Sequence, residues 1–362
     1  MMMRMHDPWG PLLDQVLNDF AEDNYPAALN RCKRILDAAP DHVDALYLAG
    51  LCLGHTGNRP AGIEWTTRAM LLKPALADYD NMRNALIQRG VSDEMEFREE
   101  LYFQYRLFQS VDAFLISYPK CGRTWLRMLL GKYVIGENGV GDPLEILELT
   151  SAHPSFSTLE VSHDDYPQLK RADKIFTNKQ AYAGKKVIFL VRDPRDVLVS
   201  YYFQYTRRGA KQLANDREFN GTPSEFICHE IGGLQSLVAF YNVWAKNRSV
   251  PADFLLITYE DMIKNARTVL SQTVEFLGWP MRDSELIDDI VAFGSFDNMR
   301  RLEETNALNN ERLKAPDDGD RESFKVRKGK VGGYRDYLTS EDCQYIDDYL
   351  RGNLDDYFSI YK

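Results

Sequence analysis

The chain of 362 residues has only five cysteines, no apolar run long enough to cross a bilayer, and no excess of basic residues. The cysteines are odd in number and lack the paired spacing of a metal site or a disulfide framework, so we expect a reducing, cytoplasmic compartment. A membrane-spanning helix needs about 20 consecutive apolar residues, and residues 1–10 lack the apolar stretch of a secretion signal. We therefore expect no membrane span.

Basic residues are also fewer than acidic ones: the chain has 44 Lys and Arg and 54 Asp and Glu, for a formal net charge of −10. This sign argues against nucleic acid or an anionic membrane as a partner of the whole surface. Hydrophobic residues make up 44% of the chain, which is typical of globular proteins with a well-filled core. The length predicts two or three domains. Any anion-binding function must then lie in a local basic pocket.

The first 90 residues contain an internal repeat with a period of 34 positions (58 minus 24). The segment from Asn24 to Leu29 returns from Asn58 to Ile63, and Pro40 returns as Pro74. This period, with Pro ending each unit, resembles the tetratricopeptide repeat over about residues 10–90. Two units bury little surface by themselves. We expect the module either to serve as a scaffold for the rest of the chain or to bind a protein partner.

After residue 110 the pattern changes to short apolar runs without helical period, which predict buried parallel strands. The runs are 113–117, 186–191 and 254–257, and helical segments separate them around 124–132, 197–205, 232–246 and 265–277. We therefore expect an α/β fold with a P-loop-like parallel sheet flanked by helices, preceded by a small all-α domain. The expected domains are residues 1–100 and 101–362. The polar segment 305–324 is expected to be a loop that acts as a lid.

The first predicted strand runs directly into YPKCGRTW, residues 118–125, and then into a helix. A strand, a tight glycine turn and a helix N-terminus together form a cradle for an anion, because unpaired backbone N–H groups point at the ligand. Lys120 adds a point charge and Thr124 a hydroxyl. The GxxxxGK[ST] spacing of the Walker A loop is absent, which removes the main support for magnesium–nucleotide hydrolysis.

This octet resembles the YPKSGTTW signature of the sulfotransferases that use 3′-phosphoadenosine 5′-phosphosulfate (PAPS). The resemblance implies that the loop holds the 5′-phosphosulfate and that its Trp stacks on the adenine. The residues implied are Lys120, Cys121, Gly122, Arg123, Thr124 and Trp125. Cys121 stands in place of a Ser and Arg123 in place of a Thr, so one hydroxyl is lost and one cation is gained. Both changes leave the backbone cradle intact.

Four later segments occur in the family's order. Arg192 and Ser200, in VRDPRDVLVSYY, match the pair that grips the 3′-phosphate. Tyr259 in YEDM and the pair Ser295 and Phe296 match positions beside the adenine, although Gly294 replaces the family's Thr.

The last segment, RKGKVGGYRDYLT, implies that Arg327, Lys328 and Gly329 bind the remaining phosphate oxygens.

The resemblance implies catalytic roles for a His base, for Lys120 at the leaving group, and for Ser200. Two histidines lie between the first two motifs, and His163 at a predicted strand end is favoured over His153, which precedes a Pro. The family's Lys two residues before the base is Val161 here. The neighbouring Asp164 and Asp165 are expected to raise the pKa of His163.

The implied function is transfer of the sulfonate from PAPS to a hydroxyl or amine, with PAP as product and no metal. The acceptor, a small molecule, glycan, lipid or peptide, is not defined by any motif, nor is the oligomeric state. Two alternatives stay open: a P-loop-like kinase or NTPase, which a magnesium requirement would reveal, and a repeat-based adaptor with an inactive body.

Overall fold

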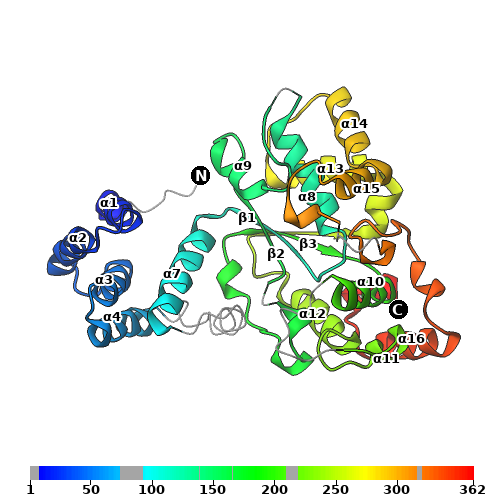
Figure 1. Cartoon of the computed structure of the whole chain (residues 1–362), viewed down its shortest axis with the longest axis horizontal. Helices are drawn as coiled ribbons and strands as arrows, with labels where there is room; N and C mark the ends of the chain where they lie inside the picture. The colour runs from blue at the N-terminus through cyan, green and yellow to red at the C-terminus, as the bar shows by residue number, and fades with distance from the viewer. Residues whose placement is uncertain (1–7, 74–92, 138, 165, 209–218, 316–319) are drawn as a thin grey trace. The chain divides into compact units, whose positions relative to one another are not determined.

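The computed structural model describes residues 8–73, 93–137, 139–164, 166–208, 219–315 and 320–362 (Figure 1). The chain divides into two compact units, Met1–Ser110 and Val111–Lys362. The boundary expected after residue 100 lies inside α7 (Glu94–Ser110), the last helix of the first unit. Pro74, Asp165 and residues 316–319, which the sequence analysis used, lie outside the described ranges.

The first unit is all-helical, as the sequence predicts. Its other described helices are α1 (Gly10–Ala21), α2 (Tyr25–Ala38), α3 (Val43–His55) and α4 (Arg59–Leu72). Proline stands in the first turn of α1, α2 and α4, where its missing N–H costs no hydrogen bond. Helices α3 and α4 approach closely at two glycines: a Cβ on Gly62 would lie 2.7 Å from the Gly50 carbonyl oxygen. The buried face of α3 supplies much of this unit's core.

The second unit is built on four parallel strands in the order β2-β1-β3-β4. They are β1 (Ala113–Ser117), β2 (Leu159–Ser162), β3 (Lys186–Val191) and β4 (Asp253–Thr258). Ile116 pairs with both Ser162 and Phe189, and Val191 pairs with Thr258. The carboxyl ends of all four strands therefore meet at one edge. The parallel α/β fold predicted from the sequence is confirmed.

Helices cover both faces of this sheet. Figure 1 shows α8 (Arg123–Ile135), α13 (Tyr259–Leu277), α14 (Ser284–Phe293) and α15 (Phe296–Thr305) on one side. On the other side lie α10 (Pro194–Arg207), α11 (Pro223–Ile227), α12 (Leu234–Asn247) and α16 (Ser340–Asn353), while the short α9 (Ile146–Ala152) precedes β2. Phe189 of β3 stacks on Trp244 of α12, with ring centroids 5.6 Å apart. The apolar strand runs are thus buried, as their composition predicts.

The polar segment 305–324 is expected from the sequence to form a lid. Its described part packs against the rest of the second unit instead. It forms short 3-10 turns at Glu311–Leu313 and Arg321–Ser323. Leu313 is only 1% exposed and packs into a small core with Met128 and Leu302. This segment therefore forms one wall of the second unit. No helix in the described part of the chain is long and apolar enough to cross a bilayer.

Candidate active site

A cavity of about 410 Å³ lies at the carboxyl edge of the sheet. At least one lining residue follows closely after each strand: Lys120 after β1, His163 after β2, Arg192 after β3 and Tyr259 after β4. Ligands of open α/β sheets bind at this edge, because the loops that leave the strands converge there. The parallel topology thus brings together residues that are far apart in the sequence.

The loop after β1 is shaped for close approach of an anion. Lys120 and Gly122 both have positive φ angles, 74° and 97°, and α8 begins at Arg123. A Cβ on Gly122 would lie 2.6 Å from the Tyr259 ring, so glycine alone suits both the angle and the space. The first N–H groups of α8 have no partner within the helix. The loop and the helix N-terminus therefore form the anion cradle that the sequence predicts.

Lys120 extends from this loop into a positively charged environment. Its Nζ donates to Gln204 Oε1 at 3.4 Å and forms no described ion pair. Burial, followed by the charges of Lys325 and Arg208, lowers the pKa of Lys120 to about 7. An anion bound beside Nζ would favour the charged form and reverse this shift.

His163 is held at both ring nitrogens. Its Nδ1 lies 2.8 Å from the Ser117 carbonyl oxygen, and its Nε2 lies 2.6 Å from Arg123 Nη2. Because the carbonyl can only accept, Nδ1 carries the proton, and Nε2 accepts from the guanidinium. Burial and then the Arg123 charge lower the pKa of His163 well below its ordinary value. The imidazole is therefore neutral, with its one lone pair directed at Arg123.

The acidic neighbour of His163 acts differently from the sequence expectation. Asp164 turns away from the imidazole into a buried cluster, where its carboxylate lies 2.7 Å from Lys179 Nζ and accepts from Tyr182 Oη at 2.8 Å and Trp244 Nε1 at 2.9 Å. The expectation that Asp164 raises the pKa of His163 is wrong, because this carboxylate is committed elsewhere. It anchors the turn after β2, where Asp164 itself has a φ of 46°.

The opposite end of the cavity holds Arg192 and Ser200. Arg192 Nη1 donates to the Lys120 carbonyl at 3.3 Å, and its Nη2 lies 3.4 Å from Asp196 Oδ2. The guanidinium stacks on the Tyr259 ring, 4.3 Å from the centroid. Ser200 lies two turns into α10 and also lines the cavity. The strand-end Arg and the helix Ser thus meet as the sequence predicts.

The C-terminal basic segment completes this end. Arg327 Nη1 donates to Glu322 at 2.8 Å, and Lys328 Nζ donates to Asp336 at 2.7 Å. Gly329 has a φ of 60°, and a Cβ there would lie 2.3 Å from the Phe296 ring, so the glycine lets the loop pass over this aromatic. Phe296 lines the cavity and is 41% exposed.

The cavity lining is strongly cationic. Seven of its residues are basic, and none of the lining residues that the structure describes is Asp or Glu. The seven are Lys120, Arg123, Arg192, Arg208, Lys325, Arg327 and Lys328. Among the described lining residues, three buried donor atoms have no hydrogen-bond partner: Arg123 Nη1, Trp125 Nε1 and Arg192 Nε. Buried donors of this kind cost free energy unless an acceptor fills the space, so the lining fits a polyanionic ligand.

Three residues that the sequence suggested for the site lie outside the lining. Cys121 is buried behind the loop, 3.4 Å from Tyr241 Oη, and burial raises the pKa of its thiol to about 12. Ser295 immediately precedes α15. His153 is exposed, with Nδ1 2.8 Å from the Leu149 carbonyl. Of the two histidines considered as base, the cavity holds His163.

Sequence reasoning missed several lining residues, chiefly Gln204, Arg208 and Lys325. A positional signal exists for all three. Gln204 and Arg208 follow Ser200 by four and eight positions, about one and two helical turns, and Lys325 precedes Arg327 by two positions in the same basic segment. Arg208 is held by Glu303 at 2.8 Å and by the carbonyls of Ser323 and Lys314.

Comparison with known proteins shows the family of the second unit. The family model described as "Sulfotransferase domain" matches residues 110–358. Flavonol 3-sulfotransferase of Flaveria bidentis is 26% identical over 282 residues, covering 72% of this chain and 87% of the relative. Sulfotransferase 2B1 of Rattus norvegicus is 28% identical over 254 residues, covering 67% and 71%. The crystal structure of mouse sulfotransferase SULT7A1 complexed with PAP has a TM-score of 0.46 and 25% identity, covering 67% of this chain and 84% of that one. The family match spans the whole α/β unit and confirms the resemblance seen in the sequence motifs: the chain belongs to the sulfotransferase domain family.

Proposed function

We propose that this sulfotransferase moves a sulfonate group from PAPS to a hydroxyl or amine of an acceptor by in-line displacement. The observation that carries the proposal is the cavity lining, with seven cations and no acid among the described residues. When bound, PAPS supplies the sulfonate in activated form, as a mixed anhydride with phosphate, and PAP is the product. The chain contributes position, charge and a proton acceptor.

The residues present fit this donor in three groups. The 5′ end is assigned to the loop after β1, with Lys120, Gly122, Arg123 and Thr124, and with Cys121 through its backbone alone. The 3′-phosphate is assigned to Arg192, Ser200, Arg327, Lys328 and Gly329. The adenine is assigned to Trp125, Tyr259 and Phe296, with Ser295 supporting Phe296 from the helix start. The unpartnered donors of Arg123, Trp125 and Arg192 support these assignments.

His163 is proposed as the general base. It is neutral, and the bond from Nδ1 to the Ser117 carbonyl fixes the tautomer, so Nε2 is the atom that takes the acceptor proton. That lone pair is engaged by Arg123 in this structure. An anionic ligand in the cradle competes for the same guanidinium, and its binding would release Nε2. The Arg that replaces a family Thr thus links donor binding to exposure of the base.

Lys120 is proposed to stabilise charge on the leaving phosphate. Fixed donors in a site shielded from water act on developing charge at no reorganisation cost. Ser200, on the first turns of α10, is proposed to support the same step from the phosphate side.

Residues 1–100 are proposed to form a tetratricopeptide-like module and residues 101–362 the catalytic domain. The close contact between Gly50 and Gly62, which stand in successive helices of the repeat, supports the first assignment. The module is proposed either to act as a scaffold or to bind a protein partner. A cytoplasmic location is supported by the cysteines, all five of which are free.

The test has two readouts. PAP is expected to raise the melting temperature of the full chain without added metal, and labelled PAPS is expected to transfer its label to members of an acceptor panel. His163→Ala is expected to reduce transfer by about 10²–10⁴ while PAP still stabilises the chain. A folded chain that does not bind PAP would refute the proposal. A strict magnesium requirement would favour the kinase alternative.

A further inference from the structure

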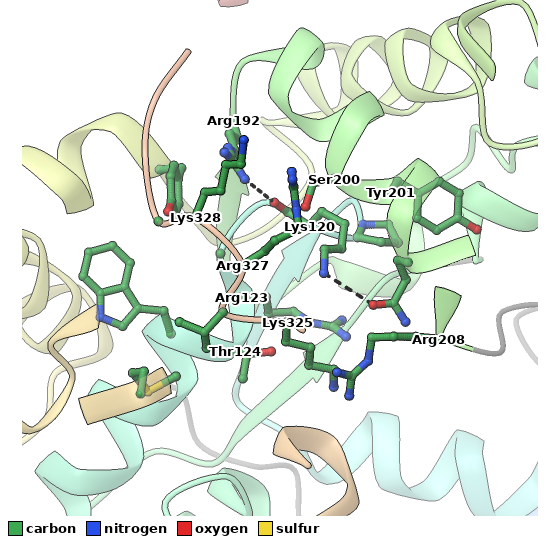
Figure 2. A pocket seen from close by; sticks show the side chains of 18 of the residues that line it. Lys120, Arg123, Thr124, Arg192, Ser200, Tyr201, Arg208, Lys325, Arg327 and Lys328 are labelled. Carbon is green, nitrogen blue, oxygen red and sulfur yellow. Dashed lines mark hydrogen bonds between the residues drawn. The ribbon is translucent and has the colours of Figure 1, made fainter. Parts of the chain in front are cut away.

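The His163 end of the cavity carries more positive charge than the described acids neutralise. Lys325 lies at this end, where its charge contributes to the lowered pKa values of both Lys120 and His163. Its Nζ donates to the Arg312 carbonyl, and it forms no ion pair with a described carboxylate. Figure 2 shows Lys325 and Arg208 on the side of Lys120 that faces away from Arg192.

Among the described residues, the acid that acts most strongly on Lys325 is Glu303, and this carboxylate is already occupied. Glu303 is fully buried, accepts from Arg208 Nη1 at 2.8 Å, and also accepts the backbone N–H groups of Lys325 and Val326 at 2.7 and 2.8 Å. Arg312, which also faces Lys325, pairs with Glu145. Burial and then the Arg208 charge lower the pKa of Lys325 to about 8, with Glu303 opposing and Arg123 and Arg312 adding to the shift. Lys325 therefore lacks a counter-ion in the described protein.

The donor assigned above has other partners for its anionic groups. Its 3′-phosphate is matched by Arg192, Arg327 and Lys328, and its 5′ end by the cradle with Lys120 and Arg123. Lys325 lies on the side of Lys120 that faces away from Arg192, and it is close enough to the proposed base for its charge to lower the pKa of His163. Lys325 is thus not needed for the anionic groups of the donor, and it faces the space that the nucleophile of the acceptor must occupy.

We propose that the acceptor of this sulfotransferase carries an anionic group, a carboxylate, phosphate or sulfate, near the hydroxyl or amine that is sulfonated. Lys325 binds this group and determines specificity, and Arg208, held in place by Glu303, adds a second positive charge. The inference rests on the proposed function, since it assigns the other half of the same cavity. A partly buried ammonium without a counter-ion gains most from an anion that shares its desolvated site.

The experiment uses matched acceptors that differ only in charge. Transfer from labelled PAPS is measured for 4-hydroxyphenylacetate against its amide, and for 3-hydroxybutyrate against its amide. Binding of the same four compounds to the PAP-saturated full chain is measured by calorimetry, which needs no turnover. The acid of at least one pair is expected to exceed its amide by about tenfold to a hundredfold in transfer or in affinity.

Variants then test whether Lys325 is the source of the preference for the acid over the amide. Lys325→Met is expected to abolish the advantage of the acid, and Lys325→Arg to retain it. The control Lys314→Met removes a charge from the segment before Lys325, where the side chain is partly exposed and its described ion pair is with Glu311. It is expected to leave the preference for the acid intact. Stabilisation by PAP shows that each variant is folded and that the donor site works. The inference is overturned if the wild-type chain treats acid and amide alike, or if the preference survives in Lys325→Met; failure of PAP to bind would instead overturn the proposed function.

Discussion

The two ends of the cavity differ in how their basic side chains are paired with carboxylates. At the Arg192 end every lining cation has a carboxylate: Arg192 faces Asp196, Arg327 faces Glu322, and Lys328 faces Asp336. At the His163 end Arg208 pairs with Glu303, but Lys120, Arg123 and Lys325 have no carboxylate partner among the described residues. These three bond instead to an amide oxygen, an imidazole and a backbone carbonyl. One end is neutralised in advance, and the other stays positively charged.

This difference explains where the pKa values are shifted. Lowered pKa values are found for Lys120, Arg123 and Lys325, in each case because burial comes first and like charges add to it. Paired cations hold their loops in place, since Asp196 also accepts the N–H groups of Gly332 and Tyr334. The unpaired cations gain free energy only when an anion arrives. We therefore expect the paired end to position the ligand and the unpaired end to act on the reacting groups.

The largest effect that would break this comparison is expected at Lys120. Removal of its charge by Lys120→Met is expected to lower the rate of transfer by about 10²–10³, as for loss of one preorganised donor at a developing charge. PAP affinity is expected to fall much less. The matched variant at the paired end, Arg192→Met, is expected to show the reverse pattern, with PAP affinity reduced by about tenfold to a hundredfold and the rate with saturating PAPS nearly unchanged.

Single-turnover rates with labelled PAPS and calorimetric PAP affinities separate the two effects. The functional difference between the two ends would be refuted if both variants lost rate and affinity in the same proportion.

A smaller effect is expected from pH. The pKa of Lys120 is about 7 in the free chain, with Lys325, Arg208 and Arg327 lowering it and Glu303 raising it. A bound anion favours the charged form, so the pKa rises on binding and a proton is taken up between the two values. PAP affinity is therefore expected to be constant below pH 7 and to fall above it, by a total no larger than the loss that Lys120→Met causes.

Calorimetry from pH 6.5 to 9 in buffers of different ionisation enthalpy measures both the affinity and the proton uptake. Lys120→Met is expected to flatten the profile, while Lys330→Met at the exposed rim serves as the control. A wild-type profile without proton uptake at pH 8 would contradict the shifted pKa.

Sequence alone predicted the parallel sheet and about half of the residues that line the cavity, because both depend on local patterns. Short apolar runs predict buried strands, and the loop after β1 has its residues within eight positions. The charge balance around each residue depends on tertiary contacts instead. Asp164 looked like a partner of His163 in the chain but bonds to Lys179, 15 positions later. Lys325 and Arg208 both line the cavity because the end of α10 and the segment around Lys325 meet there.

The smallest effect concerns the substitution that distinguishes this chain from the family motif. Arg123→Thr restores the family residue and removes the guanidinium from Nε2 of His163. Burial remains the main cause of the low pKa of His163, so the pKa is expected to rise only part of the way toward its ordinary value. Nuclear magnetic resonance of the labelled imidazole, with and without PAP, measures it. In the wild-type chain PAP is expected to weaken the contact between Arg123 and His163, whereas in Arg123→Thr the imidazole signals should respond much less to PAP. The same PAP response in both proteins would show that Arg123 does not link the cradle to the base, and the unpaired end would then act through Lys120 and Lys325 alone.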